Sequence, residues 1–213
     1  MIDRRTFCAT AVGLFAGATG LAGVQSAALA QAPSKEELMQ PGPLGEQALG
    51  SADAPVTMIE YASMTCSHCA NFDVKVFPTL KSKYIEPGKL RYIMREFPLD
   101  PLAAAGFMLA RCAGDKYFDV IDALFQTQQK WAFTREPLPQ LVAVAKQLGF
   151  TQQSFDECLS NQKVLDGIDA VRQRATEKFG VNSTPTFFIN GNIHRGEMTL
   201  EETEKALQSH LKS

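Results

Sequence analysis

The stretch Val56-Thr-Met-Ile-Glu-Tyr61, followed by Ser63, Thr65 and the tetrad Cys66-Ser-His-Cys69, determines the fold that we expect for this chain. Its first part is short and rich in β-branched and aromatic residues, which is typical of a strand. The hydroxyl side chains of Ser63 and Thr65 are good helix caps. We therefore expect a strand that leads directly into a helix beginning near Cys66.

The chain after the tetrad carries a helical pattern and then a second strand. Apolar residues recur three or four positions apart at Phe72, Val76, Phe77, Leu80 and Tyr84. Pro78 lies inside this run and predicts a kink, because proline has no backbone N–H to donate. Residues 89–97 have the composition of a second strand. Residues 56–100 are thus predicted to form a βαβ unit with parallel strands and a right-handed crossover.

Residues 101–179 have a different character, because they contain no strand signal and their apolar residues recur at helical spacing. Four apolar faces fall within residues 117–125, 138–148, 155–159 and 164–175. The simplest interpretation of these faces is core packing. We expect this segment to be an all-helical insertion.

Strand signals return in residues 180–213. Pro185 opens an apolar run that ends at Ile189, and Asn190-Gly191 is a strong signal for a hairpin turn into residues 192–196. Thr199 and Glu202 have the spacing of a capping box for a final helix. The chain is therefore predicted to be an α/β protein in which a βαβ half and a ββα half, residues 180–213, are separated by the helical insertion.

The first 30 residues have the three-part layout of an export signal. Arg4 and Arg5 form a basic start, residues 9–24 are apolar but too few to span a bilayer, and Ala28-Leu-Ala30 ends the segment with small residues. We expect residues 1–30 to be cleaved and residues 31–55 to form an N-terminal arm and linker. The paired arginines resemble a twin-arginine signal, and an ordinary Sec signal is the alternative. Either signal predicts a periplasmic protein.

The charge pattern argues against a nucleic-acid partner. The chain has 21 Lys and Arg residues against 23 Asp and Glu residues, for a formal net charge of −2, and no long run of one sign. A nucleic-acid-binding protein normally presents a strongly basic patch. We therefore expect no nucleic-acid partner.

The tetrad Cys66-Ser-His-Cys69 is placed for thiol chemistry. The thiolate is the reactive form of cysteine, and the start of a helix favours an anion. His68 adds an imidazolium or a hydrogen bond, and Cys69 offers its S–H. Cys66 is thus the expected nucleophile, and Cys69 is the expected resolving thiol. For His68, the alternative is a surface histidine without a role.

A zinc site is the alternative for two cysteines at this spacing. Structural zinc sites usually need two more cysteine or histidine ligands close together. Cys112, Cys158, His194 and His210 are isolated in the sequence and supply no such second pair. We therefore expect no metal and no cofactor.

These features together resemble the DsbA-type thiol:disulfide oxidoreductases, which have the thioredoxin fold, a central mixed sheet flanked by helices. The resemblance rests on the strand, the Cys66–Cys69 tetrad, the helical insertion and the segment Val181-Asn-Ser-Thr-Pro-Thr-Phe-Phe-Ile189. It covers residues 44–211. Ser67 stands where the best-known members have proline, so the resemblance leaves the reduction potential open.

The resemblance also assigns roles to Thr184, Pro185 and Glu60. It implies a cis peptide bond at Thr184-Pro185 beside the cysteine pair, where the backbone binds an extended substrate. It implies that Glu60 lies beneath the pair and assists proton transfer at Cys69. A carboxyl group on a buried strand has a raised pKa, which suits this exchange. The alternative for Glu60 is a solvated residue at the edge of the sheet.

Cys112 and Cys158 form the second pair once cleavage after Ala30 removes Cys8. Both lie on apolar faces of predicted helices. In an oxidising compartment they are expected to form a structural disulfide, and two inert buried thiols are the alternative.

The main functional hypothesis is a monomeric periplasmic oxidase of newly exported proteins that a membrane partner of the DsbB type reoxidises. A disulfide isomerase or reductase of the same fold is the closest alternative. Isomerases of this group generally dimerise through a substantial N-terminal domain, for which residues 31–55 are too few, although they could hold a short oligomerising helix. A periplasmic copper or zinc carrier that uses Cys66, His68 and Cys69 is a third alternative.

Overall fold

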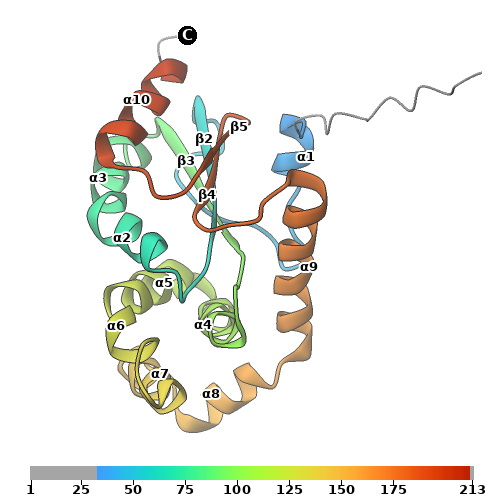
Figure 1. Ribbon diagram of the computed structural model, residues 1–213, viewed down its shortest axis with the longest axis vertical. Coiled ribbons are helices and arrows are strands. Elements are labelled where there is room, and N and C mark those ends of the chain that lie inside the picture. Colours follow the sequence, from blue (N-terminus) through green and yellow to red (C-terminus); the bar gives the residue numbers. More distant parts are fainter. Residues whose placement is uncertain (1–32, 212–213) are drawn as a thin grey trace, which may run out of the picture. The chain divides into compact units, whose positions relative to one another are not determined.

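The protein is built on a five-stranded mixed sheet with the order β1-β3-β2-β4-β5. The computed structural model describes residues 33–211 (Figure 1). The strands are β1 (Gln47–Leu49), β2 (Val56–Ala62), β3 (Leu90–Glu96), β4 (Thr186–Ile189) and β5 (Asn192–Arg195). β2 pairs in parallel with β3, and every other pairing is antiparallel. The predicted parallel pair and the predicted C-terminal hairpin are both confirmed.

The edge strand β1 was not predicted, and it lies in the segment expected to be an arm and linker. It is only three residues long, and it pairs with β3 so that Ala48 lies opposite Ile93. So short a strand has no visible alternation of apolar and polar residues, and the β3 edge supplies its hydrogen bonds. The same segment contains α1 (Lys35–Met39), which begins after Ser34 with a complete capping box.

The helix after the tetrad breaks where Pro78 predicts a kink. It consists of α2 (Ser67–Lys75), α3 (Phe77–Leu80) and a short π-helical segment, η1 (Lys81–Ile85). Val76 separates α2 from α3, and Pro78 occupies the first turn of α3, where no N–H is needed. The final helix, α10 (Leu200–Leu211), begins with the expected capping box between Thr199 and Glu202.

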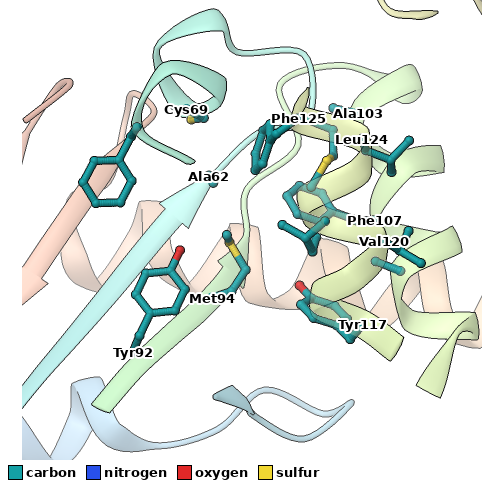
Figure 2. Close-up of a cluster of buried hydrophobic side chains, with 14 of the residues drawn as sticks. Ala62, Cys69, Tyr92, Met94, Ala103, Phe107, Tyr117, Val120, Leu124 and Phe125 are labelled. Carbon is teal, nitrogen blue, oxygen red and sulfur yellow. The ribbon is translucent and has the colours of Figure 1, made fainter. Parts of the chain in front are cut away.

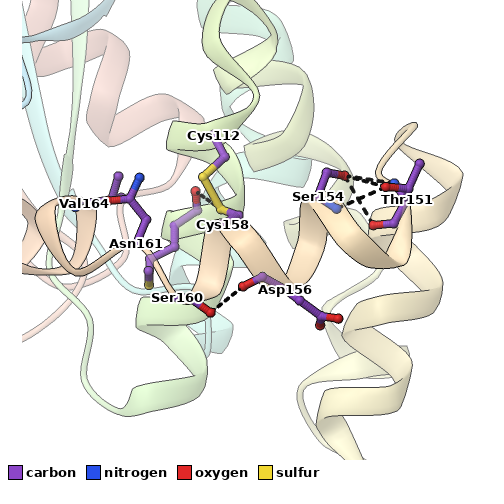
Figure 3. The surroundings of a disulfide bond; sticks show 9 residues. Cys112, Thr151, Ser154, Asp156, Cys158, Ser160, Asn161 and Val164 are labelled. Carbon is purple, nitrogen blue, oxygen red and sulfur yellow. Dashed lines mark hydrogen bonds between the residues drawn. A yellow bond between two sulfur atoms is a disulfide. The ribbon is translucent and has the colours of Figure 1, made fainter.

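All regular elements between β3 and β4 are helical. They are α4 (Pro101–Cys112), the 3₁₀ turn η2 (Gly114–Lys116), α5 (Tyr117–Gln126), α6 (Gln128–Trp131), α7 (Pro137–Gln147), α8 (Gln152–Leu159) and α9 (Gln162–Phe179). Figure 3 shows the disulfide between Cys112 at the end of α4 and Cys158 in α8, which are 6.1 Å apart at Cα. The bond joins two helices of the insertion that lie far apart in the sequence.

The two faces of β2 belong to two separate parts of the core. Met58 packs with residues of α2, α4 and α5 in the larger cluster, part of which is drawn in Figure 2. Ile59 points the opposite way and packs with Val171 and Phe179 of α9 and with Leu38 of α1. All seven residues of β2 are buried, so the cysteine tetrad follows a fully buried strand of the sheet.

The predicted export signal, residues 1–30, lies outside the described residues. Among residues 33–211, no helix has the length and the apolar character that a membrane span requires.

Candidate active site

Cys66 and Cys69 lie at the start of α2, which follows the carboxyl end of β2 after a short loop. Cys66 is the residue before the first turn of α2 and is partly exposed, whereas Cys69 is fully buried. The Nε2 atom of Gln128, from α6, donates to the carbonyl oxygens of Met64 and Cys66 at 2.9 Å each. The helical insertion therefore holds the loop that presents Cys66. The sequence contains no local signal for this role of Gln128.

Three sets of donors stabilise the thiolate of Cys66 and lower its pKa to about 5. The largest effect is a hydrogen bond from the side chain of Cys69, followed by one from the side chain of Thr184 and by the backbone N–H groups of Cys69 and His68. Partial burial opposes this shift. In the thiol form, Cys66 donates instead to the carbonyl oxygen of Thr184 at 3.3 Å, and the Thr184 hydroxyl oxygen is buried without a hydrogen-bond partner in residues 33–211. The Thr184-Pro185 peptide bond is cis.

The pKa of Cys69 moves in the opposite direction and lies well above its usual value of 9.0. Burial is the main cause, and the hydrogen bond to Cys66 adds to it. A thiolate at Cys66 is therefore much more stable than one at Cys69. This asymmetry favours Cys66 over Cys69 as a nucleophile and as a leaving group.

Glu60 lies in β2 and is only 2% exposed, which excludes the solvated alternative for this residue. The hydroxyl of Tyr92, in the parallel neighbour β3, donates to its carboxyl group at 2.6 Å. Burial raises the pKa of Glu60 to about 8, against the effect of this hydrogen bond, and the charges of Asp73 and Cys66 raise it further. Glu60 is thus mainly protonated at pH 7 and close enough to Cys69 to influence the titration of its thiol.

Asp73 is a second buried carboxyl group that the sequence pattern did not single out. It lies in α2 one helical turn after Cys69, is 6% exposed, and its Oδ2 atom has no hydrogen-bond partner among the described residues. Burial, with the charge of Asp122 in α5, raises its pKa to about 7. The only sequence signal was the spacing of four from Cys69, which places both side chains on one helix face.

His68 is exposed and forms an ion pair with Glu197, whose Oε2 atom is 2.7 Å from His68 Nδ1. Glu197 lies 129 residues away in the sequence, in the segment between β5 and α10, and was not predicted. Its hydrogen bond and charge raise the pKa of His68. Residues 33–211 contain no group of three His, Cys, Asp or Glu side chains, at this site or elsewhere, that is arranged to bind one metal ion.

The reduced protein is expected to gain stability over the oxidised protein as the pH rises from 4 to 7. The pKa of Cys66 is lowered in the folded state, so its stabilising effect is present at higher pH and is lost as the pH falls through about 5. At pH 7 we expect about 1–2 kcal/mol, after allowance for solvent screening at a partly exposed sulfur. Thermal unfolding of both redox forms from pH 4 to 8 measures this difference. The oxidised form is the matched control, since it has no thiolate, and parallel pH curves would contradict the expectation.

Comparison with known proteins agrees with this geometry. Residues 44–209 match a family model described as thioredoxin, and the chain belongs to the thioredoxin family. Within that family it is DsbA-like. It is 33% identical to alpha-DsbA1 of Wolbachia pipientis, whose crystal structure it matches with a TM-score of 0.77 over 84% of this chain and 96% of that one.

Two curated relatives have names that describe disulfide chemistry. One is a putative protein-disulfide oxidoreductase of Rickettsia bellii, 32% identical over 68% of this chain and 57% of the relative. The other is a probable disulfide bond formation protein D of Bacillus anthracis, 30% identical over 78% of this chain and 79% of the relative. The chain thus spans little more than half the length of the Rickettsia relatives that it matches.

Proposed function

We propose that this protein is a thiol:disulfide oxidoreductase that oxidises the thiols of newly exported proteins in the periplasm. The observation that carries the proposal is the opposite shift of the two cysteine pKa values, down to about 5 at Cys66 and up at Cys69. A stable Cys66 thiolate favours the reduced form of the pair and makes the oxidised form a strong electron acceptor.

The exchange proceeds in two balanced steps. A substrate thiolate attacks Cys66 Sγ of the Cys66–Cys69 disulfide, so a mixed disulfide forms, the internal bond breaks and Cys69 leaves. Cys69 needs a proton because its thiolate is unstable in this buried position, and protonated Glu60 is the proposed donor. A second substrate thiolate then attacks the substrate sulfur, a substrate disulfide forms and Cys66 leaves as its stable thiolate. Two electrons have passed from the substrate to the protein.

The backbone at Thr184 and Pro185 binds the substrate as an extended strand, beside the carbonyl oxygen that contacts Cys66. Residues 1–30 direct export, through a twin-arginine or a Sec signal, and cleavage follows Ala30. A membrane partner of the DsbB type reoxidises the pair. The protein acts as a monomer without a cofactor.

The reduction potential against glutathione tests the direction of electron flow. The redox state of Cys66 and Cys69 is followed by alkylation and mass measurement in protein that retains the Cys112–Cys158 disulfide. If the protein is an oxidase, the reduction potential of its Cys66–Cys69 pair is expected to be about −120 mV, the value of a strongly oxidising pair. A value near about −270 mV, typical of a reductase, would contradict the oxidase assignment.

Substitution of Glu60→Gln is expected to slow exchange by about ten- to hundredfold, at or below the usual contribution of a general acid or base. The part of the pH dependence that comes from Glu60, whose pKa is about 8, should disappear because glutamine does not titrate, whereas the titration of the peptide thiols remains. Stopped-flow exchange with a model dithiol peptide from pH 5 to 9 measures both effects. Thermal stability at pH 7 is expected to be retained, since the buried carboxyl group is mainly protonated there.

The exposed Glu86→Gln variant is the matched control for loss of a carboxyl group. It should retain the rate and the pH profile of the original protein. An unchanged pH profile in the Glu60→Gln variant would exclude the proton-transfer role.

A further inference from the structure

Glu197 attaches the segment between β5 and α10 to the first turns of the catalytic helix. Its Oε2 atom lies 2.7 Å from His68 Nδ1, and Asn71 Nδ2 donates to the same oxygen at 3.4 Å. The side chains of His68 and Glu197 are 65% and 33% exposed, so the pair is open to solvent on one side. Glu197 therefore contacts residues from two successive turns of α2 and remains partly exposed to solvent.

We propose that Glu197 is a positioning residue that holds His68 as an imidazolium beside the Cys66 thiolate throughout the neutral pH range. This inference rests on the proposed function, because it concerns the reactivity of the same cysteine. It goes beyond that function in naming a residue remote in sequence that sets the charge of the tetrad.

The chemistry of histidine explains why a carboxylate is needed at this place. An unperturbed imidazole loses its proton near pH 6.5, within the range in which periplasmic proteins work. A hydrogen bond and an opposite charge from Glu197 both favour the protonated ring, as does the charge of Cys66. The retained positive charge in turn favours the thiolate of Cys66.

Other ionisable residues lie near Glu197. His194 and Arg195 of β5, and Glu202 and Lys205 of α10, line a cavity of about 530 Å³ together with Glu197. The positive end of the α2 dipole favours the thiolate of Cys66. Glu197 thus has a direct repulsive effect on the thiolate as well as the favourable effect through His68, and an experiment must separate the two.

The test compares the original protein with the Glu197→Gln variant at two pH values. The pKa of His68 is measured by NMR in the reduced protein, and the equilibrium constant for oxidation of glutathione is measured at pH 5.5 and pH 8. In the variant, His68 should titrate at lower pH. At pH 5.5 the His68 ring is protonated in both proteins, so any change in the equilibrium constant there reports the direct effect of the Glu197 charge. At pH 8 the equilibrium constant of the variant should be lower by a further factor of about two to five, which is the size of an exposed charge interaction.

Two further variants isolate the effect. Glu204→Gln breaks another exposed ion pair of the same length, to Lys83, and should leave the His68 titration unchanged. In a His68→Ala background, Glu197→Gln should cause the same change at both pH values, because only the direct charge effect remains.

Two outcomes would overturn the inference: an unchanged pKa of His68, or a loss at pH 8 that persists when His68 is alanine. The NMR titration does not require catalysis. A reduction potential near that of thioredoxin would therefore contradict the proposed oxidase function. The NMR titration of His68 would still test the positioning role of Glu197 separately.

Discussion

Substitution of Cys69→Ala is expected to lower the rate of catalysed disulfide exchange by at least about a thousandfold while leaving Cys66 able to form mixed disulfides. Under the proposed function, Cys69 is the buried sulfur that forms the internal disulfide with Cys66 and can displace a substrate held there. Without it, the Cys66 thiolate attacks a substrate disulfide, one substrate sulfur leaves as a thiolate, and the mixed disulfide persists. Exchange assays with a fluorescent peptide in its dithiol form measure the lost rate, and intact mass after incubation with the same peptide in its disulfide form measures the trapped adduct.

The Cys66→Ala variant is the control for this result. It should lose activity to the same extent and form no mixed disulfide, because Cys69 is buried and the pKa of its thiol is raised. If the Cys66→Ala variant trapped substrate and the Cys69→Ala variant did not, the roles of the two cysteines would be reversed.

Removal of the second disulfide, by Cys112→Ala with Cys158→Ala, is expected to lower the free energy of unfolding by about 4 kcal/mol. The bond joins α4 to α8 across a sequence separation of 46 residues, so it restricts a long loop in the unfolded chain. For a domain of this size, the loss corresponds to a fall of about 8–16 °C in Tm. Thermal and denaturant unfolding of the oxidised proteins measure the loss of stability. The rate of disulfide exchange at 25 °C should change by less than about twofold, as for a substitution away from the site.

The control for the second disulfide is the variant with Cys66→Ala and Cys69→Ala. These cysteines are three positions apart, so their bond closes a very short loop and its loss should cost much less stability. Equal falls in Tm for the two double variants would show that the long-range bond has no special effect on the unfolded chain.

Local signals in the sequence were sufficient for most of the framework. Hydrophobic periodicity and β-branched composition predicted β2, β3 and the hairpin of β4 and β5, and the capping residues Thr199 and Glu202 predicted the start of α10. These signals act over a few neighbouring residues, so they are visible without the fold. The strand β1 escaped prediction because its stability comes from pairing with β3 rather than from its own three residues.

The candidate site likewise contains residues that the local sequence indicated and residues that only the fold revealed. Cys66 and Cys69 share one helical turn, and their spacing alone indicated thiol chemistry. Glu60 was suggested by its place in a buried strand and by resemblance to a known family, but its contact with Tyr92 required the pairing of β2 with β3. Asp73 had only a spacing to mark it, and nothing local marked Gln128.

By itself, the sequence determined which residues can react: two cysteines and a histidine at a helix start, with a carboxyl group on the strand before them. Only the tertiary structure decided how they are tuned. Hydrogen bonds, the largest from the side chain of Cys69, lower the pKa of Cys66, burial raises the pKa of Cys69, and Glu197 contacts His68 from 129 residues away in the sequence. The physical reason is that pKa values depend on solvent exclusion and on charges within a few ångströms, and the folded chain alone sets both.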